Sequence, residues 1–127
     1  MRAALQSSQA KQNEDEQKED TQVIVEQKIK PIIDGYLYII WLREFVNSQQ
    51  SVYKIGRSKD ITSRLKDYPK DSKLLYCVFT SDIVEKESKL IQLLKNENSG
   101  IIQQPKYGTE YFLGDYNVIR SFIEQLV

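Results

Sequence analysis

The feature that most constrains the fold is an unbroken run of apolar and aromatic residues at positions 36–42, YLYIIWL. A short run of this kind without polar interruption predicts a buried strand. Residues 51–56 and 73–80 are also rich in β-forming side chains and predict two further strands, the first of them pairing back on the run as a hairpin. The chain is therefore expected to build a sheet of about three antiparallel strands.

Helices are predicted between and after these strands. A short helix begins at Asp60 or Thr62 and ends before a proline, and a longer helix covers residues 83–97. Asp82 caps the longer helix and Glu85, three residues later, completes a capping box. A last helix follows, and residues 43–50 and 101–108 are predicted to be connections, with a short strand or extended segment at 110–113. The predicted fold class is α+β, a small three-stranded antiparallel sheet flanked by helices.

Composition divides the chain into two parts. Residues 1–31 are predicted to form a polar linker or a solvated helix, because they contain too few apolar side chains to bury. Residues 32–127 are predicted to form the folded domain. No apolar run approaches the roughly 18 residues that span a bilayer, no secretory signal is visible, and Cys77 has no partner for a disulfide. An intracellular protein with no membrane partner is expected.

The sequence contains no histidine and one cysteine, which narrows the possible chemistry. Nucleophile systems built on Ser-His or Cys-His pairs are excluded, as are zinc sites made of histidine or several thiolates. Catalysis would have to use carboxylates, tyrosines, lysines or arginines. Oxygen ligands of this kind suit one hard divalent ion, Mg²⁺ or Mn²⁺.

The formal net charge of the whole chain is +0, but charge is unevenly distributed. Residues 53–73 carry seven basic and three acidic side chains, a local charge of 7 − 3 = +4. Such a patch can bind phosphates while the protein stays neutral, although a solvated helix face explains the charge equally well. The basic residues of this segment are Lys54, Arg57, Lys59, Arg64, Lys66, Lys70 and Lys73.

Two charged side chains fall beside apolar stripes. Glu87 lies between Val84 and Leu90 at spacings of three on the longer helix, and a carboxylate on a packing face is costly unless it is paired or binds a metal. A salt bridge at the edge of the core is the alternative. Arg64 flanks the apolar face of the short helix, where it could bind a phosphate or merely cover apolar surface.

Tyrosine is frequent, with eight residues in the chain. Tyr36 and Tyr38 share one face of the first predicted strand, and Tyr53 lies on its partner. Any one of them is by default a core residue, but hydroxyls gathered near an arginine and a metal-binding glutamate could position a nucleophilic water and accept its proton.

Tyr38 within YLY at 36–38, followed by YKIG at 53–56, resembles the paired motifs of the GIY-YIG endonuclease family. The similarity is greatest to the variant found in phages and large DNA viruses. Gly56 stands in the place of the family's turn glycine, which allows a sharp change of direction. Lys54 is inserted after Tyr53, so that the Tyr53 hydroxyl can move to the other strand face and Lys54 can take over its contact.

The resemblance covers about residues 35–113 and continues after the second motif. Arg64 follows Gly56 by eight residues, as the family's helical arginine does, and Glu87 stands where the family has its metal-binding glutamate. Residues 108–112, GTEYF, resemble the closing G-x-E-[WY]-F motif of the viral variant. The family's late asparagine has no clear counterpart.

The resemblance implies hydrolysis of a phosphodiester bond with one Mg²⁺ or Mn²⁺ on Glu87. Arg64 would bind a phosphate oxygen or orient the nucleophile. Tyr38, with Tyr53 or Lys54, would deprotonate or align the attacking water.

The implied partner is nucleic acid, most simply DNA, with the flanking backbone bound by Arg57, Lys59 and Lys66. The polar N-terminal region also suggests an upstream or separate DNA-binding module. Two alternatives stay open: a nucleic-acid-binding module of the same fold without catalytic activity, and a protein-interaction domain without a nucleic-acid role.

Overall fold

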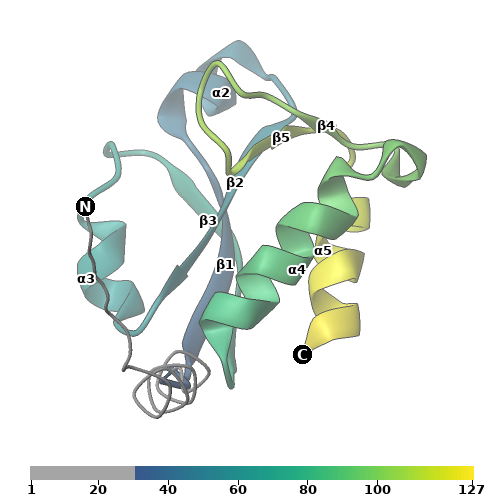
Figure 1. Ribbon diagram of the computed structural model, residues 1–127. Coiled ribbons are helices and arrows are strands. Elements are labelled where there is room, and N and C mark those ends of the chain that lie inside the picture. Colours follow the sequence, from purple (N-terminus) through teal and green to yellow (C-terminus); the bar gives the residue numbers. More distant parts are fainter. Residues whose placement is uncertain (1–30) are drawn as a thin grey trace, which may run out of the picture. The chain divides into compact units, whose positions relative to one another are not determined.

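A computed structural model describes residues 31–127 of the chain (Figure 1). Its centre is a five-stranded sheet in the order β3-β1-β2-β5-β4, and every neighbouring pair is antiparallel. The strands are β1 (Gly35–Trp41), β2 (Val52–Ser58), β3 (Lys73–Thr80), β4 (Ile102–Gln103) and β5 (Tyr111–Leu113). The helices are α2 (Arg43–Ser48), α3 (Ile61–Leu65), α4 (Ile83–Lys95), a 3-10 turn η1 (Glu97–Ser99) and α5 (Tyr116–Leu126).

The apolar run predicted to be a buried strand is β1, the middle strand of the long three. Successive side chains of a strand point to opposite faces, so β1 contributes to two separate cores. Leu37 and Ile39 face one core, whereas Tyr38 and Ile40 face the other. All four are almost fully buried. A strand enclosed on both faces explains why the sequence shows no polar alternation here.

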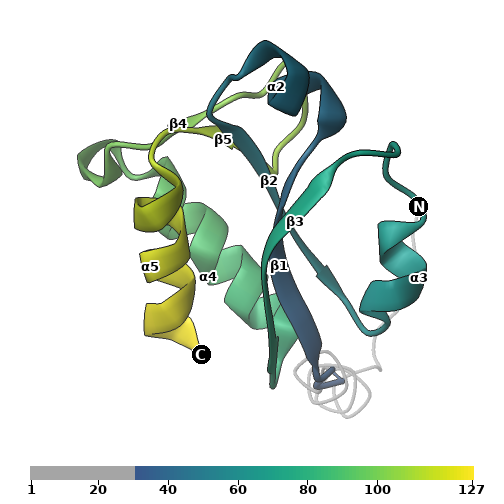
Figure 2. The same ribbon diagram turned by 180° about the vertical axis from the view of Figure 1, so that it is seen from behind.

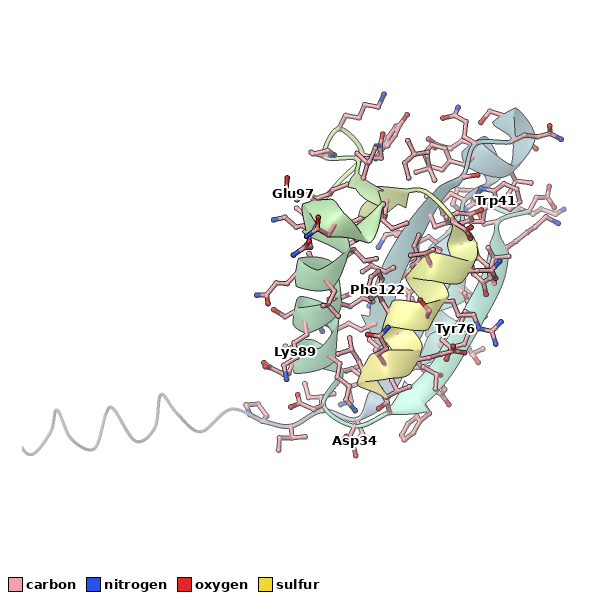
Figure 3. All side chains as sticks on the ribbon, turned by 90° about the vertical axis from the view of Figure 1, so that its right-hand side faces the viewer. Asp34, Trp41, Tyr76, Lys89, Glu97 and Phe122 are labelled. Carbon is pink, nitrogen blue, oxygen red and sulfur yellow. The ribbon has the colours of Figure 1, made fainter. Side chains whose placement is uncertain are left out.

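The first core is covered by α4 and α5, which lie side by side over one face of the sheet (Figure 3). Each helix begins at an aspartate whose carboxylate accepts a hydrogen bond from a backbone amide of the first turn, Asp82 from Glu85 and Asp115 from Asn117. Helix α5 places Ile119 and Ile123, spaced one turn apart, against the core. This spacing fixes which face of the helix packs.

The second core lies on the opposite face of the sheet, where Figures 1 and 2 show α3 away from α4 and α5. Phe45 of α2 enters this core, together with Ile61 and Leu65 of α3. Asp60 caps α3 by accepting a hydrogen bond from the Ser63 amide at 3.1 Å. The short helix is therefore held both by its cap and by apolar contacts.

The predicted α+β class with an antiparallel sheet is confirmed, but the count of three strands is wrong. Strand β5 corresponds to the short strand or extended segment predicted at 110–113, whereas the two-residue strand β4 lies in the region 101–108 that was predicted to be a connection. The region 43–50, predicted to be a connection, contains α2, whose only buried residue is Phe45. The predicted linker lies, apart from Pro31, outside the described residues. Among the residues described, no helix is long and apolar enough to cross a membrane.

Candidate functional site

A polar cavity of about 200 Å³ lies beside the end of β2. Strand β5 pairs with β2 only along Val52–Lys54, and the Ile55 amide then donates to the Glu110 carbonyl at 3.0 Å. Beyond this point, within residues 31–127, no strand pairs with that edge of β2, and side chains from both sheet faces can meet there. The cavity is lined by Lys54, Gly56, Arg57, Arg64, Glu87 and Glu110.

Glu87 reaches this cavity from the second turn of α4. Its side chain is only 9% exposed, because the helix stripe turns it toward the sheet. Arg57 Nε donates to Glu87 Oε1 at 3.0 Å, which pairs the buried charge. The other oxygen, Oε2, is buried and no donor among the described residues reaches it. An unsatisfied buried carboxylate oxygen is costly, and at a polar cavity it indicates a place for a ligand.

Glu110 approaches Glu87 from the segment that precedes β5. Its Oε1 accepts a hydrogen bond from Lys54 Nζ at 2.7 Å. The Lys54 ammonium also lies over the rings of Tyr68 and Tyr111, 5.8 and 5.7 Å from their centroids. These contacts fix a lysine, which is otherwise a flexible side chain, in one position at the cavity wall.

The two carboxyl groups influence each other. Burial, and then the negative charge of Glu110 together with a hydrogen bond to it, raise the pKa of Glu87 to about 7, although Arg57 opposes the shift. Burial acts to raise the pKa of Glu110 as well, but the hydrogen bond and charge of Lys54 outweigh it and keep that pKa below its ordinary value. Near neutral pH, Glu110 is therefore the ionised partner and Glu87 is poised between its two forms.

Tyr38 supports the site from behind β2. The strands place Tyr38 opposite Gly56, and any Cβ on Gly56 would overlap the end of the tyrosine ring. The Tyr38 hydroxyl is 2.6 Å from that of Tyr68 and also forms a hydrogen bond with Arg64. Burial, followed by the hydrogen bond to Tyr68, raises the pKa of Tyr38 well above its ordinary value, so that it stays protonated. Arg64 in turn donates from Nη1 to the Arg57 carbonyl at 3.2 Å.

The structure does not bring Tyr53 to this group. Tyr53 is 8% exposed and packs in the core under α4 and α5, between Trp41 and Tyr116. Gly56 and Lys54 are two residues apart and share a strand face, whereas Tyr53 is three residues from Gly56 and faces the other way. Lys54 thus occupies the position at the cavity that the second motif would otherwise give to a tyrosine.

Two of the three basic residues predicted to bind nucleic acid, Arg57 and Lys59, line a second, larger cavity. This neighbouring cavity measures about 460 Å³ and shares Arg57 and Arg64 with the first. Lys59 lines it, whereas Lys66 is exposed at the end of α3 and lines neither cavity. Two arginines between adjoining cavities could contact consecutive phosphates of one strand.

Sequence reasoning did not assign a role to Glu110, nor the ion pair between Arg57 and Glu87. Glu110 is far from Lys54 and Glu87 along the chain, and only the short β5 pairing brings it beside β2. One signal was present: Glu110 is the single charged residue of the GTEYF segment at 108–112. Arg57 was predicted, from the resemblance, to contact the flanking backbone, and its pairing with Glu87 was not predicted.

The chemistry of the site fits a hard divalent cation. Carboxylate oxygens are the side-chain ligands that Mg²⁺ and Mn²⁺ prefer, and Glu87 Oε2 is buried at the cavity with no hydrogen-bond donor from the described part of the chain. No cluster of three or more acidic, histidine or cysteine side chains suited to a metal occurs in residues 31–127. A cation here would keep several waters, as Mg²⁺ ordinarily does.

Comparison with known proteins gives one family. Residues 35–127 match the family described as the T5orf172 domain. No curated protein and no solved structure matches the chain significantly. The matched region contains every element of the fold, from β1 to α5.

Proposed function

The chain belongs to the T5orf172 domain family, and on this basis we propose that it is a metal-dependent endonuclease. The family is associated with phages and is related to GIY-YIG-like and HNH-like nucleases. The proposed reaction is hydrolysis of DNA phosphodiester bonds at a GIY-YIG-type site. The observation that carries the proposal is Glu87 Oε2, which has no hydrogen-bond partner within residues 31–127 and lies at a cavity that Lys54, Arg57 and Arg64 also line, together with Gly56 and Glu110. A buried carboxylate beside three cations is the arrangement expected for a phosphate and a metal ion together.

The residues of the cavity take distinct roles in this proposal. Glu87 holds one Mg²⁺ or Mn²⁺, and such an ion, when bound, stabilises the charge that develops on phosphorus and on the leaving oxygen. Arg57 and Arg64 bind non-bridging phosphate oxygens, and Lys54 contacts the same phosphate from the β5 side. Water forms the new bond to phosphorus and loses a proton to solvent, while the bond to the 3′ oxygen breaks and that oxygen takes up a proton from solvent.

Tyr38 acts as a positioning residue rather than as the base. Its hydroxyl is buried under Gly56, and its raised pKa keeps the proton in place at neutral pH. Its hydrogen bond to Arg64 fixes the guanidinium at the cavity. Tyr53 takes no part in this proposal, since it packs between Trp41 and Tyr116 in the core and does not line the cavity.

DNA is proposed to enter along the larger cavity, where Lys59 contacts the flanking backbone, and Lys66 adds a more distant phosphate contact. A domain of this size reads few bases. Sequence selection is therefore assigned to a partner or to an upstream DNA-binding module.

The test is nicking of supercoiled plasmid in Mn²⁺ or Mg²⁺, with EDTA as the metal-free condition. Glu87→Gln is expected to reduce the rate at least about 100-fold, because it removes the charge that holds the ion. Glu85→Gln is the matched control, since Glu85 lies on the same helix, is 59% exposed and contacts only Lys89 at 3.8 Å. Equal rates for the two variants would contradict the proposal.

A DNA-binding module without catalysis is the second candidate, and one observation favours it. The position at the cavity that a tyrosine would fill is taken by Lys54, whose amine is already bonded to Glu110. This candidate predicts that the wild-type protein binds duplex DNA at low salt but cuts it with no divalent metal. Binding without cutting by both the wild type and Glu87→Gln would decide for it.

A further inference from the structure

The second carboxylate of the cavity has no role in the proposed function. Glu110 and Glu87 line the same polar cavity of about 200 Å³. Two carboxylates this close repel each other unless a proton or a cation lies between them. Arg57 and Lys54 each offset one of these two charges, and a cation bound between the carboxylates would offset the repulsion that remains.

The hydrogen bonds of the two carboxylates are arranged in the same way. Arg57 bonds Oε1 of Glu87 at 3.0 Å, and Lys54 bonds Oε1 of Glu110 at 2.7 Å. Neither bond uses Oε2, and no donor from residues 31–127 reaches the buried Oε2 of Glu87. Outer partners that hold one oxygen of a carboxylate and leave the other for an ion are characteristic of metal ligands.

We propose that Glu87 and Glu110 together bind one divalent cation, Mg²⁺ or Mn²⁺, with Glu110 as a second protein ligand. This inference rests on the proposed function, which requires a cation at Glu87. Mg²⁺ sites typically combine one or two carboxylates with several waters. The cavity of about 200 Å³ has room for on the order of six waters at ~30 Å³ each, which is enough for a partly hydrated ion.

Lys54 and Arg57 then have a second purpose. Each orients a ligand carboxylate through its hydrogen bond. The Lys54 side chain is only 15% exposed and pairs with Glu110, so it is well placed to hold the Glu110 carboxylate in one orientation.

The test measures Mn²⁺ binding by isothermal titration calorimetry at pH 8, independently of DNA cleavage. Glu110→Gln is expected to weaken Mn²⁺ binding by about 10- to 100-fold, as loss of one of two charged ligands should. Glu85→Gln, on the exposed side of α4, is expected to leave the affinity unchanged. In the Glu87→Gln background, Glu110→Gln should reduce Mn²⁺ affinity by a much smaller factor than in the wild type, because both residues bind the same ion.

Glu110→Asp separates coordination from charge, since it keeps the charge and withdraws the carboxylate by one methylene. A ligand role predicts clearly weaker binding by this variant, and wild-type affinity would overturn the inference. As a measurement independent of any variant, a crystal containing Mn²⁺ should show an anomalous peak about 2.0–2.2 Å from an oxygen of each glutamate. A peak on Glu87 alone would also overturn it.

The two proposals fail separately. Loss of Mn²⁺ affinity in Glu87→Gln but not in Glu110→Gln would remove the second ligand and leave the nuclease proposal standing. Mn²⁺ binding that depends on both glutamates, in a protein that never cuts DNA, would support the shared site and refute the nuclease. Absence of Mn²⁺ binding by the folded wild type would refute the shared site.

Discussion

Replacing Gly56 by alanine tests whether the close approach of Tyr38 to the β2 backbone builds the site. A Cβ on Gly56 would lie 2.9 Å from Cε1 of the Tyr38 ring and would overlap its Cζ and Oη. The ring is rigid and fully buried, so that the ring or the strand has to move. Overpacking a core costs about 1–3 kcal/mol, and overlap with three ring atoms places this substitution near 3 kcal/mol.

Urea unfolding measures this cost, and a second background shows where it comes from. For a domain of this size, 3 kcal/mol corresponds to a fall in Tm of roughly 12–24 °C. Tyr38→Leu removes Cε1, Cζ and Oη, so Gly56→Ala in that background should be near neutral or stabilising by up to about 1 kcal/mol. The difference between backgrounds is the coupling between the two residues, about 3 kcal/mol.

If Gly56→Ala lowered the free energy of unfolding equally in both backgrounds, the reasoning would be refuted. Glycine would then be needed at position 56 for the backbone conformation and not for contact with the Tyr38 ring. Tyr38→Phe provides an intermediate background that removes Oη and keeps the rest of the ring. The cost of Gly56→Ala there should fall between the other two. This variant also keeps the comparison possible if Tyr38→Leu folds poorly.

Three further predictions concern the site and its surroundings. Arg57→Ala should lower the free energy of unfolding in urea by about 1–2 kcal/mol, since it leaves the Glu87 carboxylate buried without a partner. This cost is smaller than that of a fully buried pair because Arg57 is 43% exposed. In the Glu87→Gln background, Arg57→Ala should lose most of this cost. In EDTA, the free energy of unfolding of the wild type should fall as pH rises from about 4.5 to about 7, because the native state retains the Glu87 proton longer than the unfolded state does, and Glu87→Gln should flatten this slope. For DNA, Lys59→Ala and Lys66→Ala should each lower the salt dependence of duplex binding by about one phosphate contact, whereas Tyr53→Phe should change the cleavage rate less than about twofold; a large loss in Tyr53→Phe would return that hydroxyl to the mechanism.

Local signals predicted the longer elements well. Strand β3 has the bounds that its β-forming residues indicated, and α4 begins after Asp82, whose carboxylate caps the helix as predicted. The predicted capping box is not completed by Glu85, because the Asp82 amide donates to Asp34 instead. Helix α2 was not predicted, because Leu42 provides no side-chain cap and a single buried residue, Phe45, creates no apolar periodicity. Strand β4 was not predicted, because it has only two residues and it is defined by its pairing with β5.

The site was predictable where it depended on local geometry. Glu87 could be found because a charged residue on an apolar helix stripe is an inconsistency that sequence shows directly. The period of two along β2 separates Tyr53 from Gly56 and keeps Lys54 with it, which is readable from the spacing once the strand is known. Glu110 could not be placed, because its position depends on where β5 meets β2, a long-range pairing that residue pattern does not encode.

The open edge of β2 explains how a neutral chain can present a site for an anionic polymer. Side chains from α4, from α3 and from the segment before β5 converge there only because β5 stops pairing at Lys54. The cavity walls carry three basic and two acidic groups, a charge of 3 − 2 = +1, and a bound divalent ion would raise it to +3. A charge of that size within a small polar cavity attracts a phosphodiester even when the net charge of the whole chain is zero. Salt at 0.1 M screens the interaction with charges that lie more than about 10 Å away. The net charge of the chain therefore says little about its ligand, whereas the edge at which β5 ends decides where a phosphate can bind.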